Sequence, residues 1–468
     1  MRSLFLIKFS LAKSLILLGL IYAQNSYSQG TMQMTYGGKS LEKGNDILVA
    51  ENGDFILAGE SESFDRDNRC IYLLRVNTSG DVIWSKIYDN GVFEMPNRVL
   101  QSPDGGFLIV GERYPKSGQT ELAFVMKIGS DGTYKWSKIY DGGGNMAEAL
   151  AGSTTRDGSY IITGRAEKTL MVTDIFYQVS SEMRYLYLFK IKQNGDPLWS
   201  KKYSSGSDIK LTRGNDVVQT ADGGYVITGE FDNVTSGKRV VNVALLKVDG
   251  LGNILWCKEF SGTKTDVGAK VIETADGGYL IGGETESYGS GKMDICLIKT
   301  DQNGSVLWSK TYGGKSYDQL GSIIEFENGN IAIVGKISDE KTEDANVLIC
   351  IIDAKGNVLS SFSYGGQGLD NATSVALMEK GLAVIGNSLS AIMGNMEMLL
   401  ITSDLTGNSP CNAQSVKIQA ISFKPDVKDM SELTIAKAIT EKPTSANNAS
   451  DDTHLGKSVN TVKGVICK

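Results

Sequence analysis

Short runs of alternating apolar and polar residues, each ended by a glycine turn, recur along most of the chain. Residues 268 to 308 show the unit: two such runs meet at Asp276-Gly277-Gly278, and two more meet at Asn303-Gly304. A period of two predicts β-strands, and Asp-Gly or Asn-Gly between two strands predicts a tight hairpin because glycine accepts positive φ. The unit is therefore a four-stranded antiparallel meander, whose strands we name A, B, C and D in chain order.

The D strand carries the phrase Trp-Ser-Lys-x-Tyr, and its tryptophan sets the repeat. The intervals between successive tryptophans are 52, 63, 57 and 52 residues, for Trp84, Trp136, Trp199, Trp256 and Trp308. Two more copies, without tryptophan, fall 52 residues outside this series, at Met32 and Ser360. Seven copies of a four-stranded meander with glycine turns predict a β-propeller.

The count of strands also predicts how the ring closes. The first D strand, residues 31 to 37, precedes every A-B-C group, and the last group, residues 371 to 407, has no D strand after it. If the N-terminal strand completes the last blade, neither sheet edge stays free. We therefore predict an all-β, seven-bladed β-propeller of four-stranded antiparallel blades over residues 31 to 410, closed by the N-terminal strand.

Two repeated features predict how the blades pack. Trp308, Lys310 and Tyr312 share one face of their strand, and we expect the aromatic rings to fill the wedge between blades. A glycine at a fixed offset ends each B strand, which suggests a close approach of one sheet to the next. These glycines are Gly59, Gly111, Gly164, Gly229, Gly283, Gly335 and Gly386.

The two ends of the chain differ from the repeats. Residues 1 to 28 combine three cations with the apolar run SLILLGLIYA and a small-x-small motif, so we expect a signal peptide cleaved after Ser28, or alternatively after Ala23. The apolar run is shorter than the ~20 residues of a membrane span. Export would place the protein outside the cell, on the cell surface or in the periplasm. Residues 411 to 468 are expected to be a polar, partly flexible tail, with a short helix over residues 429 to 442.

Composition narrows the classes of function. The formal net charge of −7 becomes −10 once residues 1 to 28 are removed, which disfavours nucleic acid and anionic membranes as partners. The single histidine, His454, lies in the tail, so Ser-His-Asp, Cys-His and multi-histidine metal sites are excluded from the repeats. We expect a monomer with no metal, no cofactor, no assigned catalytic residue and no transmembrane segment after cleavage.

Six cysteines are too few for a disulfide scaffold. Cys257, Cys296 and Cys350 lie in strand-like runs and are expected to be buried free thiols. Cys411 and Cys467 bracket the tail and form the expected disulfide, which would close a loop of ~56 residues and stabilise the tail, but not the propeller, by about 4 kcal/mol. Cys70 is an alternative partner for either.

The repeats resemble a known group of proteins. The patterns Trp-x-Lys-x-Tyr-Gly-Gly, Thr-x-Asp-Gly-Gly-Tyr-x-x-x-Gly and Asp-x-x-Leu-x-Lys-x-Asp-x-x-Gly-Asn-x-x-Trp are similar to those of secreted bacterial β-propeller repeat proteins. The resemblance covers residues 31 to 410 and implies the propeller fold and secretion. It implies no particular activity. Such proteins often carry a C-terminal domain for type IX secretion, and the residues after Cys411 do not match one.

Loop lengths indicate which face of the propeller carries the function. The extra residues of the longer repeats fall in a B-to-C connection, residues 166 to 185, and in a D-to-A connection, residues 204 to 216. In a meander these two kinds of connection project from the same face. Variable loops gathered on one face of a rigid scaffold predict a binding surface.

Two sets of charged residues in equivalent repeat positions point to this face, although ordinary solvated strand ends are the alternative reading. The first set starts the A strands at the expected mouth of the central channel, in register with Ser322 and Ser374. Its members are Asp46, Arg98, Asp216 and Lys270. The second set follows the B-strand glycine, in register with Arg165 and Lys336, and its expected ligand-binding members are Glu60, Glu112, Glu230 and Glu284.

We therefore expect a secreted or cell-surface binding module that engages a peptide, a glycan or a partner protein through the variable face. Two alternatives stay open: an enzyme acting on a polysaccharide or peptide with acid or tyrosine chemistry at the channel mouth, and a structural scaffold. A deep pocket with convergent carboxylates would favour the enzyme, and a broad shallow surface would favour the binding module.

Overall fold

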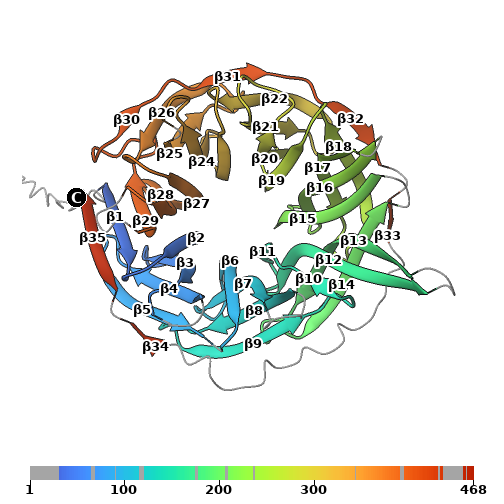
Figure 1. Ribbon diagram of the computed structural model, residues 1–468, viewed down its shortest axis with the longest axis horizontal. Coiled ribbons are helices and arrows are strands. Elements are labelled where there is room, and N and C mark those ends of the chain that lie inside the picture. The colour runs from blue at the N-terminus through green and yellow to red at the C-terminus, as the bar shows by residue number, and fades with distance from the viewer. Residues whose placement is uncertain are drawn as a thin grey trace, which may run out of the picture.

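The chain folds into seven β-sheets arranged around a central opening (Figure 1). The structure, a computed structural model, describes residues 31–64, 69–89, 91–114, 121–173, 178–205, 209–235, 238–342, 344–390, 395–430, 433–435, 457–459 and 461–467. In these ranges the chain forms strands and turns without a helix, so no described helix could cross a membrane. The protein is thus the all-β, seven-bladed β-propeller that the repeat predicts.

Each blade is an antiparallel meander that runs from the central channel to the rim, and we number the blades 1 to 7 from β2. The A strands are β2 (Glu42–Val49), β6 (Phe93–Gln101), β10 (Met146–Ala147) with β11 (Ala151–Thr154), β15 (Ile209–Gln219), β19 (Asp266–Glu273), β23 (Gln319–Glu325) and β27 (Asp370–Met378). The B strands are β3 (Phe55–Ser61), β7 (Phe107–Tyr114), β12 (Tyr160–Thr173), β16 (Tyr225–Thr235), β20 (Tyr279–Thr285), β24 (Ile331–Ser338) and β28 (Gly381–Ser388).

The outer half of each blade consists of strands C and D. The C strands are β4 (Cys70–Val76), β8 (Leu122–Ile128), β13 (Gln178–Ile191), β17 (Lys238–Val248), β21 (Asp294–Thr300), β25 (Ala345–Ile352) and β29 (Glu397–Ser403). The D strands are β5 (Val82–Tyr88), β9 (Tyr134–Tyr140), β14 (Pro197–Ser205), β18 (Ile254–Ser261), β22 (Val306–Gly313), β26 (Val358–Tyr364) and, in blade 7, β1 (Met32–Gly37).

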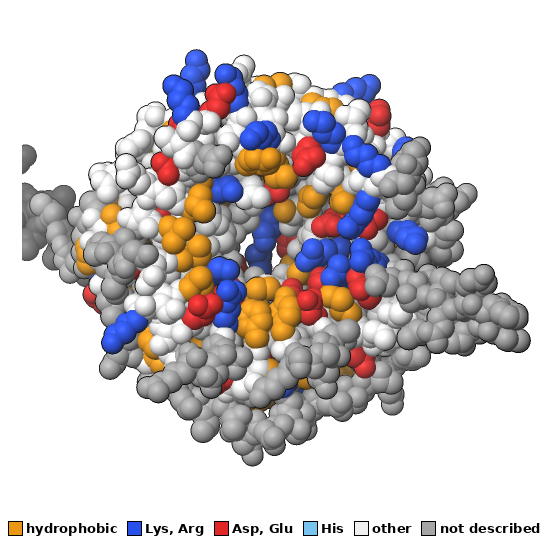
Figure 2. Space-filling model, viewed as in Figure 1, with side chains coloured by type: hydrophobic (Ala, Val, Ile, Leu, Met, Phe, Trp, Pro, Cys, Tyr) orange, Lys and Arg blue, Asp and Glu red, His pale blue; other side chains and the backbone are white. Residues whose placement is uncertain are grey.

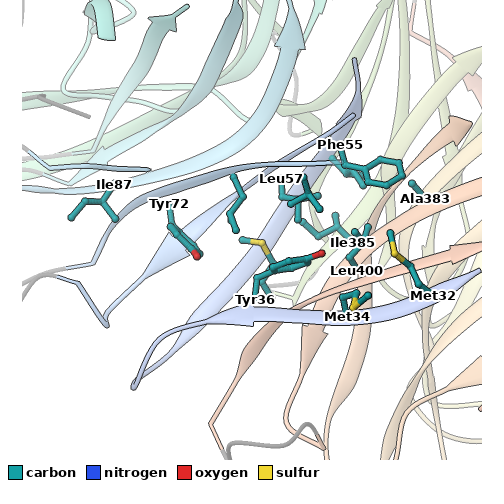
Figure 3. Packing of buried hydrophobic residues seen from close by; sticks show 14 of the residues in the cluster. Met32, Met34, Tyr36, Phe55, Leu57, Tyr72, Ile87, Ala383, Ile385 and Leu400 are labelled. Carbon is teal, nitrogen blue, oxygen red and sulfur yellow. The ribbon is translucent and has the colours of Figure 1, made fainter. Parts of the chain in front are cut away.

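The N-terminal strand closes the ring as predicted. β1 pairs antiparallel with β29, from Met32 opposite Thr402 to Tyr36 opposite Met398. Figure 3 shows Met32, Met34 and Tyr36 of β1 packed among buried side chains of blades 1 and 7. All three are at most 2 % exposed, so the strand is an integral part of the core between these two blades.

The tyrosine of the repeated D-strand phrase joins each blade to the next. In six of the seven blades its hydroxyl donates a hydrogen bond, 2.5 to 2.9 Å long, to a carbonyl oxygen in the C-to-D turn of the following blade. The pairs are Tyr36–Gly80, Tyr88–Gly132, Tyr140–Gly195, Tyr203–Gly252, Tyr312–Gly356 and Tyr364–Gly407. Phe260 holds the position in blade 4 and has no hydroxyl. The Tyr36 bond links blade 7 to blade 1, which completes the ring.

The glycine that ends each B strand allows a close contact between strands A and B of the same blade. A Cβ atom on Gly283 would lie 1.8 Å from the carbonyl oxygen of Val267 on strand A of the same blade. The other six glycines meet the equivalent carbonyl oxygen at 1.8 to 2.1 Å. The prediction that these glycines mainly allow one sheet to approach the next is therefore wrong. Each one makes room for the backbone of the neighbouring strand.

The described part of the tail lies on the rim of the propeller as a series of fifth strands (Figure 1). These are β30 (Gln414–Ser415), β31 (Gln419–Ser422), β32 (Asp426–Asp429), β33 (Leu433–Ile435), β34 (Lys457–Ser458) and β35 (Val462–Cys467). Strand β33 lies within residues 429 to 442, so the expected helix is wrong for Leu433–Ile435, and residues 436 to 442 lie outside the described part. The backbone groups of β33 pair with the exposed edge of a D strand, an option that the local sequence pattern does not reveal.

Candidate functional site

A one-residue bulge kinks the A strands at the channel wall, next to the predicted charged positions. In six blades the pairing of strands A and B skips one residue there, immediately before Asp46, Arg98, Asp216, Lys270, Ser322 and Ser374. In blade 3 the same point is the break between β10 and β11. An extra residue re-aims the side chains that follow it. The bulge therefore decides what this part of each A strand presents to the channel.

The predicted aspartates lie inside the channel, where they connect neighbouring blades. Asp46 is 3 % exposed, and its carboxylate accepts hydrogen bonds from the Val99 backbone N–H at 2.8 Å and from the Ser374 hydroxyl at 2.6 Å. Asp216, also 3 % exposed, accepts a bond from the Val271 N–H of the next blade at 3.1 Å. Both carboxylates thus have a structural role between A strands.

Arg98 and Lys270 supply the positive charge beside these two aspartates. Arg98 Nη1 lies 3.6 Å from Asp46 Oδ1, and the attraction of Asp46 holds the pKa of Arg98 above its ordinary value. Burial, and then repulsion by Arg98, lowers the pKa of Lys270, while Asp216 and Asp46 oppose this shift. The structure therefore brings the four residues of the first set together as one charge-balanced layer in the channel.

A cavity of about 440 Å³ occupies the channel beside this layer. Arg98 and Ser374 line one part of it, and Gln101, Thr154 and Leu377, which lie nearer the A-to-B turns, line another. The cavity thus extends from the charged layer toward the face of the tight turns, away from the variable connections.

The second predicted set does not converge on one site. Glu60 lies 3.4 Å from Lys43 Nζ and 3.7 Å from an Arg69 guanidinium nitrogen, both within blade 1. Glu112 and Glu230 accept hydrogen bonds from the bulge asparagines of their own blades, Asn97 at 2.8 Å and Asn215 at 3.1 Å. Glu284 lies in blade 5, where burial raises the pKa of its carboxyl to about 7. These residues are spread around one face of the ring.

The longer repeats build raised strands where loops were expected. β12 and β13 pair over their full length, from Tyr160 opposite Ile191 to Thr173 opposite Gln178, so most of residues 166 to 185 are strand. β15 begins at Ile209, within the expected connection of residues 204 to 216. The prediction of a loop is therefore wrong for these residues. Blades 3 and 4 extend further than the others on the face of the B-to-C and D-to-A connections, which we call the loop face.

A continuous series of ion pairs covers the loop face of blades 3 and 4. Arginines and carboxylates alternate along it in the order Arg213, Glu148, Arg165, Glu167, Arg184, Asp232 and Arg239, and we call these seven residues the arginine–carboxylate chain. Apart from the shortest pair, Arg165–Glu148, the nitrogen–oxygen separations run from 2.7 to 3.9 Å. Figure 2 shows acidic and basic side chains gathered beside the central opening, over β11, β12 and β15.

The arginines of this chain remain accessible while its carboxylates are largely buried. The arginine side chains are 21 to 55 % exposed, and Glu148 and Asp232 are 5 and 9 % exposed. The sequence signalled only Arg165, through its repeat position. The other members come from five different strands and from the break between β10 and β11, so their proximity depends on the fold.

Acidic and phenolic groups adjoin one end of the arginine–carboxylate chain, between blades 2 and 3. The Tyr114 hydroxyl donates to Glu112 Oε2 at 2.5 Å. Burial, followed by the charges of Glu148 and Glu112, raises the pKa of the Glu121 carboxyl to about 7. Burial also raises the pKa of Glu112. Protonation of Glu121 near neutral pH relieves the repulsion among these three carboxyl groups.

The raised carboxyl pKa values predict how stability depends on pH. The folded-state pKa of Glu121 and Glu284 is about 7, above the ordinary 4.5, so the native state binds protons more tightly than the unfolded chain. Their contribution to stability is complete below pH ~4.5 and is lost as the pH rises through ~7. We expect a lower urea midpoint at pH 8 than at pH 5, and a smaller difference in Glu284→Gln. Equal midpoints for the wild type would contradict the assignment.

Cysteines and metal ligands add little to the site. Cys257, Cys296 and Cys350 are buried free thiols as expected, and Cys70 is also buried. Burial raises the pKa of Cys350 to about 12, which keeps this thiol unreactive. Cys411 is disulfide-bonded, while the side chain of Cys467 lies outside the described part. His454 also lies outside it. Among the described residues no cluster of three or more His, Cys, Asp or Glu could hold a metal ion.

No family model matches the chain, and no curated protein matches it significantly. Among solved structures it is similar to the WD40 β-propeller domain of Doa1, at 14 % identity and a TM-score of 0.46, over 79 % of this chain and 96 % of that one.

Two further structures show the same low similarity. Sqt1 from Chaetomium thermophilum is 9 % identical, with a TM-score of 0.42 over 80 % of this chain and 98 % of that one. The GH93 α-L-arabinofuranosidase of Fusarium graminearum is 11 % identical, with a TM-score of 0.37 over 80 % and 98 %. A WD40 domain and an α-L-arabinofuranosidase thus both occur among these structures. The chain is a seven-bladed β-propeller, and its fold leaves the function unresolved.

Proposed function

We propose that the protein is an exported binding module that recognises a peptide or protein partner on the loop face of blades 2 to 4. The observation that carries the proposal is the arginine–carboxylate chain, which sits on the two blades that rise above the rest. Arginine is enriched at protein interfaces, and a surface of both charges suits a partner with complementary charges. A disulfide-bonded Cys411 and the signal-like residues 1 to 28 support export to an oxidising compartment.

The residues predicted from the sequence differ in their relation to the proposed surface. Glu112 lies at the edge of the arginine–carboxylate chain, and Glu230 belongs to blade 4, so both border the proposed surface. Asp46 and Asp216 fix the A strands that form its inner margin, together with Arg98 and Lys270. Glu60 and Glu284 lie on other blades, and we assign them no contact with the partner.

The proposal is tested by probing peptide and glycan arrays with the purified full-length protein. We expect retention on peptides that carry both acidic and basic residues, with a signal that falls as salt rises from about 0.05 to 0.5 M, because screening weakens exposed charge pairs. Retention on glycans alone, or binding that is insensitive to salt, would contradict it.

A second candidate function is cleavage of a glycosidic bond. It is favoured by the carboxyl groups of Glu112, Glu121 and Glu148, because a carboxylic acid with a pKa near 7 beside a second carboxylate is the pair that this chemistry uses. Glu148 is, however, paired with Arg165 and Arg213, which occupy its carboxylate. A glycan that the protein cleaves on the array would favour this function over binding.

A further inference from the structure

The tail follows the rim of the propeller in the reverse order of the blades. β30 pairs with the D strand of blade 6, β31 with that of blade 5, β32 with that of blade 4 and β33 with that of blade 3. After residues 436 to 456, which lie outside the described part, β34 pairs with the D strand of blade 1 and β35 with that of blade 7. Figure 1 shows these strands along the outer edge of the ring. The tail therefore returns to the blade from which it departs.

Backbone and serine hydrogen bonds attach the tail to the D strands. Ser85 and Ser309 of the Trp-Ser-Lys phrase, and Ser361 at the equivalent position of blade 6, point outward. Ser85 and Ser361 each donate a hydroxyl hydrogen bond to a tail carbonyl at 2.5 Å, and Ser309 makes the same contact. The backbone N–H groups of Val459, Val416 and Phe423 donate back to the carbonyls of these serines at 3.1 to 3.2 Å. The serine at this position thus attaches the tail in three of the blades.

The tail also places an apolar side chain against one core cluster after another. Val416, Phe423 and Met430 follow each other at seven-residue intervals and pack against three successive clusters, and Val459 and Ile466 show the same spacing further on. The Phe423 ring stacks on Tyr288, with centroids 4.4 Å apart. Each step of the tail therefore covers the outer end of one gap between blades.

The two ends of the tail meet in blade 7. The backbone of Cys467 lies opposite Gln33 in the pairing of β35 with β1, and the Gln33 side-chain amide donates to the carbonyl oxygen of Cys411. Cys411 is 3 % exposed and disulfide-bonded. Asn412, next to it, has a φ of 54° and is the one non-glycine residue with positive φ in the described ranges, so the chain turns sharply there. Cys257, Cys296 and Cys350 of the blades are free thiols.

We propose that a disulfide between Cys411 and Cys467 closes the tail into a covalent belt around the propeller. The bond forms when the two thiols lose two protons and two electrons to a disulfide oxidant of the exporting compartment, which becomes a dithiol. Because both ends are anchored on blade 7 and the middle is paired with the rims of five other blades, the belt resists the outward separation of blades. The stabilisation then falls on the propeller itself, in contrast to the expectation that only the tail would gain.

Peptide mapping of the denatured, alkylated and non-reduced full-length protein tests the bond directly. We expect one cross-linked peptide pair that contains Cys411 and Cys467, which separates when dithiothreitol supplies two electrons and becomes a cyclic disulfide. Recovery of alkylated Cys467, or of Cys411 joined to another cysteine, would overturn the proposal.

Thermal unfolding tests the effect of the belt on the propeller. Reduction of the wild type should lower its melting temperature by about 4 to 5 °C, as expected for opening a closed loop of ~56 residues in a protein of this size. The double variant Cys411→Ser/Cys467→Ser should have a melting temperature close to that of the reduced wild type, and reductant should not change it. Trypsin should cleave after Lys463 faster in Cys467→Ser than in the wild type. An unchanged melting temperature after complete reduction would contradict a belt that holds the blades.

Discussion

A chain that lacks residues 31 to 37 should have no cooperative unfolding transition. The deletion removes three side chains, Met32, Met34 and Tyr36, that are nearly fully buried between blades 7 and 1. Their burial alone contributes about 5 to 9 kcal/mol, which is comparable to the whole stability of a typical domain. The deletion also exposes the edge of β29 and removes the strand with which β35 pairs. Calorimetry and size-exclusion chromatography should show a broad transition and aggregation.

The matched control keeps the strand and removes only its link to the next blade. Tyr36→Phe loses the 2.9 Å hydrogen bond to Gly80 and should cost about 1 kcal/mol, because Phe260 already fills the equivalent position in blade 4. A sharp, unshifted melting transition in the deletion variant would show that β1 does not close the ring.

Gly283→Ala should lower the free energy of unfolding by about 3 kcal/mol or more. The added Cβ would lie 1.8 Å from the carbonyl oxygen of Val267, and this oxygen belongs to the backbone, so it cannot rotate away. Relief requires strand A to shift at the bulge before Lys270, next to the charged layer. Urea unfolding measured against the wild type gives the difference directly.

Gly314→Ala is the control, because its Cβ would meet only Asp318 Oδ2 at 3.8 Å, an ordinary contact, and Gly314 has no positive φ. We expect a change within about 0.5 kcal/mol. Equal losses in the two variants would mean that the B-strand glycines are not required by the neighbouring carbonyl.

The sequence predicts the propeller because the repeat states the same local rule seven times. The alternation of apolar and polar residues, the Asp-Gly turns and the Trp-Ser-Lys-x-Tyr phrase all indicate the same four-stranded blade. The strand at residues 31 to 37 has no blade of its own, so it can only complete the last one. The repeat does not predict the bulges in the A strands, because a bulge depends on how two strands pair. The sequence consequently predicts Asp46 and Asp216 at the channel mouth, whereas they lie in the channel wall.

The belt and the arginine–carboxylate chain could not be predicted from the sequence for a different reason. The belt strands are two to six residues long, and all four residues of β32 (Asp426–Asp429) are exposed, so these strands have no amphipathic pattern of their own. The edges of the D strands determine where they pair. The ion pairs join residues up to 65 positions apart, from Glu148 to Arg213, and only the fold brings them together.

The binding assignment is tested most directly by the dissociation constant of an array-selected peptide for two variants. Arg213→Ala/Arg239→Ala removes the two ends of the arginine–carboxylate chain, and Lys380→Glu reverses an exposed charge in a tight turn on the opposite face. We predict that the first variant binds at least about tenfold more weakly, with a melting temperature within about 2 °C of the wild type, and that the second binds like the wild type. Equal affinity of both variants and the wild type would contradict recognition on the loop face of blades 2 to 4.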